Sequence, residues 1–457
     1  MYGVTHFHIS RTKYPALFDY CADMTAKSKN LRNAVLFRLR QHFTSIGRDT
    51  LMDLQKEVRD EIERTCGKTG WEMPGSVISD CFMEKLLRIT ENPDFLKGLP
   101  RQSAQAVTKE TVTEFESWLK ALAAYQKDPS SFTGKPKMPK YTRTDRRTVT
   151  MTNQDCVVYE GKNGALSLKL PMTKERLNVV LPSGAVLKEV KISPYYSGYE
   201  IIAVYETECE TEACDRAFAA GIDLGVNNII AFVSNDGGRP ILYKGGAIKA
   251  MNQFYNKTRA KYTGILMKGH DPKEVNLHTA RLERAGRKRS CFLHDEMHKI
   301  STHVIRECIS RNIGTLVIGK NTQWKTNSNM SKKSNQNFVQ IPHSTLIHMI
   351  RYKAERKGIR VIEQEESYTS RASFLDHDEL PVYGEKSNPV FSGRRISRGL
   401  YRSKDGTVIS ADINAGANVL RKAMPEAFEG MNDFSYLYNV RTVRFRDLHP
   451  VRKTKKM

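Results

Sequence analysis

The sequence predicts a multidomain α+β fold, and three stretches of the chain support this prediction. Between residues 13 and 128, apolar residues recur at spacings of three and four, as in amphipathic helices. Short β-rich runs separated by turn residues follow, up to residue 206. From residue 216 onward strand-like and helical segments alternate, which predicts a mixed α/β sheet.

The first stretch, residues 13–128, predicts a module of roughly four helices. The segments LRNAVLFRLRQHF, ISDCFMEKLLRIT and TKETVTEFESWLKALAAYQ each place apolar side chains along one helix face. Glycine and proline interrupt the pattern at GKTG, EMPG and GLP, where helices would end. A short extended run, VTHFHIS, precedes the module.

The second stretch contains several short strands close together. LSLKLP, LNVVLPSG, LKEVKIS and YYSGYEIIAVYE are rich in β-forming residues and are bounded by glycine, proline or serine. This spacing predicts a small β-barrel-like domain or a sandwich. The acidic segment TECETEACD, residues 207–215, then predicts a linker to the next domain.

The third stretch begins with three consecutive strands, GIDLG, IIAFVS and PILYKG. A helical region from about residue 273 to 311 follows, then the strand TLVIG, the helix HSTLIHMIRYKAERKG and the strand IRVIEQEES. A polar, arginine-rich stretch precedes a last helix, SADINAGANVLRKAM. This order is typical of the RNase H fold, in which the first three strands form an antiparallel meander.

The charge balance indicates a polyanionic partner. Lys and Arg number 73 and Asp and Glu 50, a formal net charge of +23. A membrane surface is not expected, since we find neither an amphipathic basic helix nor a lipidation motif. The first residues lack a secretory signal, and the eight cysteines are scattered without a CxxC pair. We therefore expect a cytoplasmic protein with reduced thiols.

Basic residues gather in separate clusters that predict contacts to a phosphate backbone, although a solvated basic face is the alternative for each. Besides the tail RTVRFRDLHPVRKTKKM, the predicted nucleic-acid-binding residues are Lys135, Lys137, Lys140, Arg143, Arg146 and Arg147, then Arg287, Lys288 and Arg289, and finally Arg394, Arg395, Arg398 and Arg402.

Two aspartates predict a metal site. Asp223 stands between two apolar runs, where an uncompensated charge costs several kcal/mol. Asp412 opens the last helix, whose small residues 415–417 allow close packing on the sheet. RNase H-type sites hold two Mg²⁺ ions about 3.5–4 Å apart between carboxylates at one sheet edge. We expect both aspartates to bind Mg²⁺, with Mn²⁺ as an alternative ion. An ordinary hairpin-turn carboxylate is the competing interpretation of Asp223.

Five segments in order carry a resemblance to a known family: GIDLGVNN, TLVIGKN, FVQIPHSTLIHMIRYKAERKGIRV, EESYTSRASF and ADINAGANVLRKA. Over about residues 130–425 the chain resembles TnpB, the transposon-encoded RNA-guided nucleases related to type V CRISPR effectors. The resemblance implies a guide RNA and double-stranded target DNA as partners, a short motif read beside the target, and Mg²⁺-dependent DNA cleavage by one RuvC-type site. It also implies a prokaryotic, nucleoid-associated protein, for which we expect a monomer.

The resemblance further implies a division into domains. These are a wedge domain (residues 1–12 and 129–206), a helical recognition lobe (13–128), a RuvC-like nuclease domain (216–369 and 409–457) and an inserted target-binding or lid segment (370–408).

The chain departs from the family where the second metal carboxylate usually follows the strand TLVIG. Gly319 and Lys320 stand there, and neither binds Mg²⁺. Some members of the family and the related Fanzor proteins use a relocated glutamate three residues before a Thr-Ser pair, which here is Glu366. Because neighbouring strand residues face opposite sides, only one of Glu365 and Glu366 can join the site. We predict Asp223, Glu366 and Asp412 as the catalytic metal ligands, with Glu365 as the alternate to Glu366.

A second departure concerns zinc. The segment 370–408 has no cysteine, whereas the family usually carries two zinc-binding CxxC pairs there. No zinc is therefore expected, and the cluster DHDE at residues 376–379 is interpreted as a polar loop. Two other functions remain open: a nuclease-inactive, RNA-guided DNA-binding repressor, suggested by Gly319, and a guide-independent, strand-transferring transposase.

Overall fold

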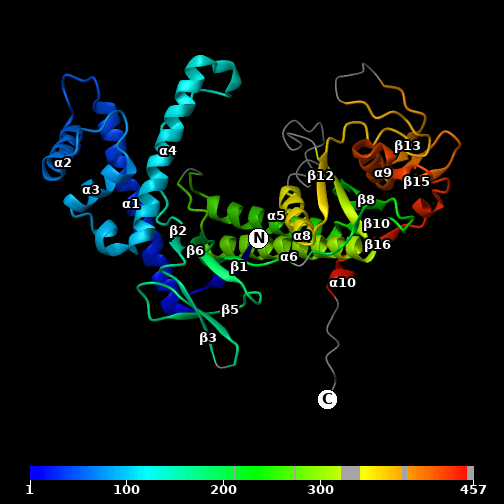
Figure 1. Ribbon diagram of the computed structural model, residues 1–457, viewed down its shortest axis with the longest axis horizontal. Helices are drawn as coiled ribbons and strands as arrows, with labels where there is room; N and C mark the ends of the chain where they lie inside the picture. Colours follow the sequence, from blue (N-terminus) through cyan, green and yellow to red (C-terminus); the bar gives the residue numbers. More distant parts are fainter. Residues whose placement is uncertain (162, 210, 272–273, 321–339, 383–388, 450–457) are drawn as a thin grey trace. The chain divides into compact units, whose positions relative to one another are not determined.

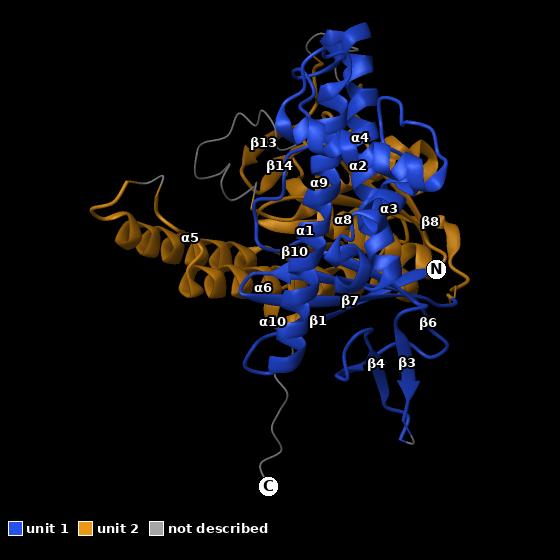
Figure 2. Cartoon of the chain, turned by 90° about the vertical axis from the view of Figure 1, so that its left-hand side faces the viewer, with its two compact units in different colours: residues 1–208 blue, residues 209–457 orange. Residues whose placement is uncertain are grey.

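The computed structural model describes residues 1–161, 163–209, 211–271, 274–320, 340–382 and 389–449 (Figure 1). The chain divides into two compact units, residues 1–208 and 209–457 (Figure 2). The division falls within the acidic segment that the sequence predicts as a linker. No described helix combines the length and the apolar character needed to span a bilayer.

Helices fill the N-terminal part of unit 1, as the helical periodicity predicts. Ser79 caps the third of them, since its hydroxyl accepts a hydrogen bond from the Phe82 N–H at 3.2 Å. A partly buried ion pair also joins α1 to α2, with Arg38 Nη2 2.8 Å from Glu61 Oε1. The four helices are α1 (Pro15–Ser45), α2 (Asp53–Thr69), α3 (Asp80–Ile89) and α4 (Arg101–Lys127), and two short turns of other helix types cover Asp94–Gly98 and Pro129–Ser131.

The strands of unit 1 form two antiparallel sheets. The larger has the order β1-β7-β6-β2 and the smaller the order β3-β4-β5. β1 and β2 lie at opposite edges of the larger sheet and do not pair with each other, so the described strands do not close into the expected barrel. Their bounds are β1 (Tyr2–Ile9), β2 (Val149–Thr152), β3 (Val157–Glu160), β4 (Leu166–Lys169), β5 (Arg176–Val179), β6 (Val186–Tyr195) and β7 (Gly198–Glu206).

Unit 2 is built on a six-stranded sheet with the order β12-β11-β8-β9-β10-β16. β8, β9 and β10 form an antiparallel meander, and β11 and β12 run parallel to β8, as the sequence order predicts for an RNase H fold. The bounds are β8 (Asp215–Leu224), β9 (Asn228–Ser234), β10 (Ile241–Lys244), β11 (Ile313–Gly319), β12 (Arg360–Gln364) and β16 (Arg441–Val443).

Helices cover both faces of this sheet. Side chains such as Ile222 and Ile318 pack with α6 and α8 on one face, and Val233 and Val317 pack with α9 on the other. One helix, α5, lies outside the expected elements. The bounds are α5 (Gly246–Met267), α6 (Ala280–Ser310), α8 (His343–Arg356), α9 (Ala411–Ala423) and the short α10 (Phe445–Leu448).

Small residues bring α9 against the sheet. A Cβ added to Gly221 of β8 would overlap the carbonyl oxygen of Gly416 on α9, so the two backbones touch at this point. Ala415, Gly416 and Ala417 are all buried, in agreement with the close packing expected for this helix. The start of α9 is therefore held close to the end of β8.

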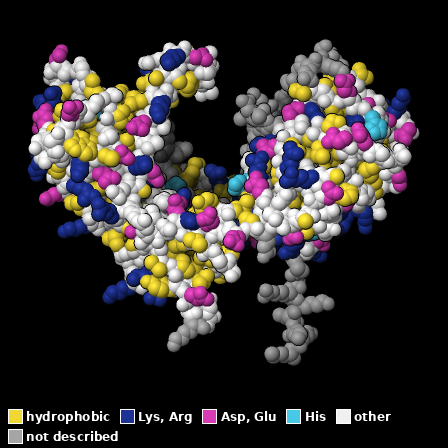
Figure 3. All heavy atoms as spheres, in the orientation of Figure 1, with side chains coloured by type: hydrophobic (Ala, Val, Ile, Leu, Met, Phe, Trp, Pro, Cys, Tyr) yellow, Lys and Arg dark blue, Asp and Glu magenta, His cyan; other side chains and the backbone are white. Residues whose placement is uncertain are grey.

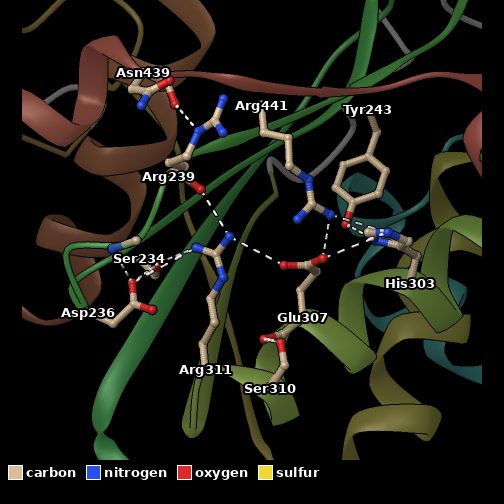
Figure 4. Close-up of polar contacts among 11 residues, drawn as sticks. Ser234, Asp236, Arg239, Tyr243, His303, Glu307, Ser310, Arg311, Asn439 and Arg441 are labelled. Carbon is tan, nitrogen blue, oxygen red and sulfur yellow. Dashed lines mark hydrogen bonds and ion pairs between the residues drawn. The ribbon is translucent and has the colours of Figure 1, made fainter.

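A polar network fixes β16 at its edge of the six-stranded sheet (Figure 4). Arg441 of β16 pairs with Glu307 on α6, and Arg311 Nη2 lies 3.3 Å from Glu307 Oε2. Arg311 also donates to the carbonyl oxygen of Arg239 at 3.1 Å. Part of the expected basic tail thus forms a strand, parallel to β10.

The segment inserted before α9 contains a three-stranded antiparallel sheet, β13 (Arg394–Ser397), β14 (Leu400–Arg402) and β15 (Val408–Ser410). In the DHDE cluster, the Asp378 carboxylate accepts hydrogen bonds from the backbone N–H groups of Ser373 and Ser392. This carboxylate therefore closes a loop.

Candidate active site

Asp223 is the last residue but one of β8 and lies on the face that packs against α9. Strand alternation explains this placement, because Ile222 packs on the α6 face and its neighbours must point the other way. The parallel register pairs Ile318 of β11 with Ile222, so Gly319 continues β11 beside Asp223. The carboxyl ends of β8 and β11 thus lie together at one edge of the sheet.

Asp412 belongs to the first turn of α9, where a carboxylate is favoured by the helix dipole. Its Oδ2 accepts a hydrogen bond from Nδ2 of Asn228, the first residue of β9, at 2.5 Å. Arg395 of β13 approaches the other oxygen, with Nη2 3.7 Å from Oδ1. Both carboxylate oxygens of Asp412 therefore have a donor or a cation beside them.

Glu366 follows the end of β12 by two residues, and its side chain reaches over Gly319. A Cβ added to Gly319 would lie 2.8 Å from Glu366 Oε2 and 3.3 Å from the carbonyl oxygen of Ile222. The Glu366 carboxylate thus fills the space above position 319, next to Asp223. A glycine at this position is what makes room for it.

Glu365 points to a different partner. Its Oε2 accepts a hydrogen bond from Lys422 Nζ at 2.7 Å, and its Oε1 accepts one from the Ser367 N–H at 2.7 Å. Lys422 is almost fully buried, with 6% of its side chain exposed. Although burial acts in the other direction, these hydrogen bonds lower the pKa of Glu365. Glu365 is therefore paired with α9, whereas Glu366 lies toward Asp223.

The carboxylates at the sheet edge affect one another strongly. Burial and the neighbouring Asp412 raise the pKa of Asp223 to about 7, and Arg395 acts in the opposite direction. Burial and Asp223, with a smaller contribution from Glu365, raise the pKa of Glu366 to about 8. Asp223 is the common neighbour in both pairs. Three carboxyl groups are thus crowded at one place, where a bound cation would stabilise their ionised forms.

The donor chemistry of this place fits a hard divalent cation, because carboxylate oxygens are the ligands that Mg²⁺ prefers. Within the described ranges, however, no three His, Cys, Asp or Glu side chains stand close enough to enclose a metal ion. Asp412 is held by Asn228 and Arg395 in this arrangement. Mg²⁺ commonly binds through one or two carboxylates together with substrate phosphates, so an incomplete protein cage does not conflict with that ion.

Three matches connect the chain with known proteins. Residues 203–325 match the family model OrfB_IS605, described as probable transposase, and residues 343–419 match the Cas12f1-like TNB domain. A TnpB-like protein of Acidianus two-tailed virus is 28% identical over 209 residues, which are 45% of this chain and 42% of that protein. Over these residues the chain is similar to TnpB proteins.

The solved structures that match the chain include two Cas12f complexes. The Cas12f1–sgRNA–target DNA complex has 12% sequence identity and a TM-score of 0.46, covering 92% of this chain and 98% of that one. The CRISPR-Cas12f ternary complex has 13% identity and a TM-score of 0.33, with 90% and 83% covered.

The basic residues predicted to bind nucleic acid fall into two groups in the structure. Some have internal contacts: Arg147 pairs with Glu110 at 2.8 Å, Arg146 stacks on Tyr199, and Arg289 donates to Asn252 Oδ1 at 2.7 Å. On the face seen in Figure 3, Lys and Arg side chains are spread over each unit among acidic ones. The exposed members of the predicted set are Lys135, Lys137, Lys140, Arg143, Arg287, Lys288, Arg394, Arg395, Arg398 and Arg402.

Two residues at the site are absent from the sequence prediction. Asn228 contacts Asp412, and Lys244 at the end of β10 donates to Asn228 Oδ1 at 2.8 Å. The sequence LGVNN directly after Asp223 was the available signal, since β9 must begin at the same sheet edge where β8 ends. Arg395 was expected as a phosphate ligand, and its position beside Asp412 was not foreseen.

The raised pKa of Asp223 predicts that the metal-free protein becomes more stable when this charge is removed. The folded state retains a proton that the unfolded chain releases above about pH 4. The stability due to this proton is present at low pH and is lost as the pH rises through about 7. In EDTA, the free energy of unfolding of Asp223→Asn should therefore exceed that of the wild type by about 1–3 kcal/mol at pH 8. At pH 5 the difference should be clearly smaller.

Thermal unfolding at the two pH values measures this difference. The exposed Glu355 on α8 provides the control, because Glu355→Gln removes a carboxylate of the same unit that lies at the surface. An equal gain in melting temperature for both variants at pH 8 would contradict the expected repulsion.

Proposed function

We propose that this chain is an RNA-guided DNA endonuclease that cuts target DNA beside a short flanking motif, using one RuvC-type two-metal site. The observation that supports it best is the gathering of Asp223, Glu366 and Asp412 at one edge of a sheet with the RNase H strand order. These three residues would hold the ions, Mg²⁺ or Mn²⁺, and zinc has no part in the proposal. When bound, a pair of such ions supplies stabilisation of the attacking and leaving oxygens of a phosphodiester.

The protein side chains have distinct tasks in this proposal. Asp223 sits at the centre of the two interacting pairs and serves as the shared ligand. Glu366 and Asp412 approach from the end of β12 and the start of α9, on either side of it. Arg395, beside Asp412 and 45% exposed, can turn its guanidinium to a phosphate oxygen of the substrate and hold that group in place.

A guide RNA would supply the sequence specificity, and the protein would read the shape of the heteroduplex and the flanking motif. The net charge of +23 and the exposed basic residues support nucleic-acid partners. In the proposed arrangement the helices of residues 13–128 form the recognition lobe, residues 1–12 and 129–206 the wedge domain, and 370–408 the segment that contacts target nucleic acid. The protein would act as a monomer in a prokaryotic cytoplasm, associated with the nucleoid.

A second candidate is an RNA-guided repressor that binds DNA without cutting it. The absence of an enclosed metal cage among the described side chains favours this alternative, as does glycine at position 319. The matched family description, probable transposase, keeps strand transfer as a third outcome.

One experiment separates these functions. The protein is expressed with its flanking DNA, the copurified RNA is sequenced, and the ribonucleoprotein is incubated with plasmids that carry a matching target beside randomised flanks. We expect linear product only with a matching target and Mg²⁺, and none in EDTA. Stable binding without nicks would establish the repressor instead, and joined strands formed without guide RNA would establish the transposase.

A further inference from the structure

A chain of side chains leads from β10 across β9 to Asp412. Lys244 Nζ donates to Asn228 Oδ1 at 2.8 Å, and Asn228 Nδ2 donates to Asp412 Oδ2 at 2.5 Å. We call these three residues the β10–α9 relay. Its members come from β10, β9 and α9, and all of them are partly buried.

The backbone is shaped to place this relay. Lys244 is the direct cross-strand partner of Asn228, and the register of β9 and β10 shifts by a bulge between Tyr243 and Lys244. Glycines on both sides allow the tight approach: a Cβ at Gly225 would lie 2.5 Å from the carbonyl oxygen of Asn228, and one at Gly245 would lie 2.6 Å from that of Val226. The two strand ends are thus packed around the amide.

The chemistry of the three groups fixes the direction of the amide. An ammonium group has donors only and an ionised carboxylate has acceptors only. The Asn228 amide must therefore turn its oxygen to Lys244 and its NH₂ group to Asp412. Lys244 in this way determines that a donor, and not a second acceptor, faces the carboxylate.

We infer that Asn228 and Lys244 are positioning residues for the metal ligand Asp412. This inference rests on the proposed function, because it requires Asp412 to bind a divalent cation. Asn228 holds Oδ2 and leaves Oδ1 for the ion, at the oxygen that Arg395 now approaches. Partners of this kind orient metal-binding carboxylates, and losing one typically weakens metal binding by about 10–100-fold.

The chain contains a matched control. Lys249 donates to Asn227 Oδ1 at 2.6 Å, so the neighbouring asparagine carries the same lysine–amide pair. This second pair has no contact with Asp412 among the described interactions. Lys249→Met therefore removes an equivalent hydrogen bond without affecting the relay.

The test is a titration of the purified, metal-free protein with Mn²⁺, followed by electron paramagnetic resonance of the free ion. Asn228→Leu and Lys244→Met should each raise the dissociation constant by about 10–100-fold, whereas Lys244→Arg and Lys249→Met should stay within about threefold of the wild type. In cleavage assays with the ribonucleoprotein, the Mg²⁺ concentration that gives half of the maximal rate should rank the variants in the same order as the Mn²⁺ dissociation constants. At saturating Mg²⁺ the cleavage rates of the variants should recover to that of the wild type.

Two results would overturn the inference, and one control separates it from the proposed function. A purely structural role would lower the melting temperature of Asn228→Leu and leave its Mn²⁺ affinity unchanged. An equal loss of affinity in Lys249→Met would also refute the relay. Asp223→Ala is titrated alongside: if it too binds Mn²⁺ like the wild type, the metal site itself is wrong. If Asp223→Ala alone loses binding, the site stands and the relay does not.

Discussion

If the proposed function holds, we expect Asp223→Ala and Glu366→Gln each to reduce plasmid cleavage by the ribonucleoprotein about a thousandfold or more, and Glu365→Gln to stay within about threefold of the wild type. A bound ion supplies several kcal/mol of transition-state stabilisation, and each 1.36 kcal/mol corresponds to about a tenfold change in rate. The Glu366 carboxylate lies above Gly319 and interacts with Asp223, so each of the two carboxylates is expected to be needed for the ions. Single-turnover cleavage rates at saturating Mg²⁺ measure the effect.

Glu365→Gln is the matched control for Glu366→Gln. Each substitution replaces one carboxylate oxygen by an NH₂ group, and the two residues are adjacent in the sequence. We expect Glu365→Gln to lower the free energy of unfolding, because Lys422 would lose its ionised partner. Only 6% of the Lys422 side chain is exposed, so water cannot replace that partner. Rates are therefore compared below the melting temperature of every variant, with target binding measured in parallel. A large rate loss in Glu365→Gln with an active Glu366→Gln would reverse the assignment of the ligand.

A second large effect is expected at Gly319. The side chain introduced by Gly319→Asp would occupy the space that holds the Glu366 carboxylate, 2.8 Å from where a Cβ would lie. Because this contact is with the flexible end of Glu366, we expect the glutamate to be displaced and cleavage to fall about a hundredfold, with the fold intact. The Val419 side chain, 3.1 Å from the same Cβ position, must also give slightly.

The double variant distinguishes displacement from general damage. Glu366→Ala removes the carboxylate that fills the space beside residue 319. When it is combined with Gly319→Asp, the new aspartate supplies a carboxylate to the same space from β11. We expect this variant to cut at least about tenfold faster than either single variant, a coupling found only between groups that share one site. Gly319→Ala is the smaller control, since it displaces Glu366 without supplying a carboxylate. If the loss of cleavage rate in the double variant equals the product of the losses in the two single variants, the two side chains do not share this space.

Local sequence pattern alone pointed to two of the three carboxylates that we propose as metal ligands. Asp223 stands out because its flanks are apolar, and Asp412 because it begins a helix of small residues. Glu366 required the resemblance to TnpB. Glu366, and not Glu365, points toward Asp223 because Glu365 is paired with Lys422, a residue far along the chain. Strand alternation was a weak guide there, because β12 ends at Gln364, before both glutamates.

Elements with little buried apolar surface escaped prediction. In α5 only Ile248 and Asn252 are buried, so no apolar stripe marks the helix. α5 packs on α6 partly through cation–π contacts. In one of them the guanidinium carbon of Arg289 lies 5.3 Å from the centre of the Tyr255 ring. The sheet of β13–β15 is similar, since its short strands are mostly exposed and Tyr401 is its main buried side chain. Strands β9, β10 and β11 were predictable because nearly all of their residues are buried and most are apolar. The edge strand β16, with the sequence RTV, was not predicted.

The crowding above Gly319 also limits how such a site can change over generations. A side chain at position 319 and the carboxylate of Glu366 would compete for one volume, because a Cβ on residue 319 would lie 2.8 Å from Glu366 Oε2. The effect of a substitution at either position therefore depends on the residue at the other, and an acid at 319 fits without strain only where residue 366 leaves this space.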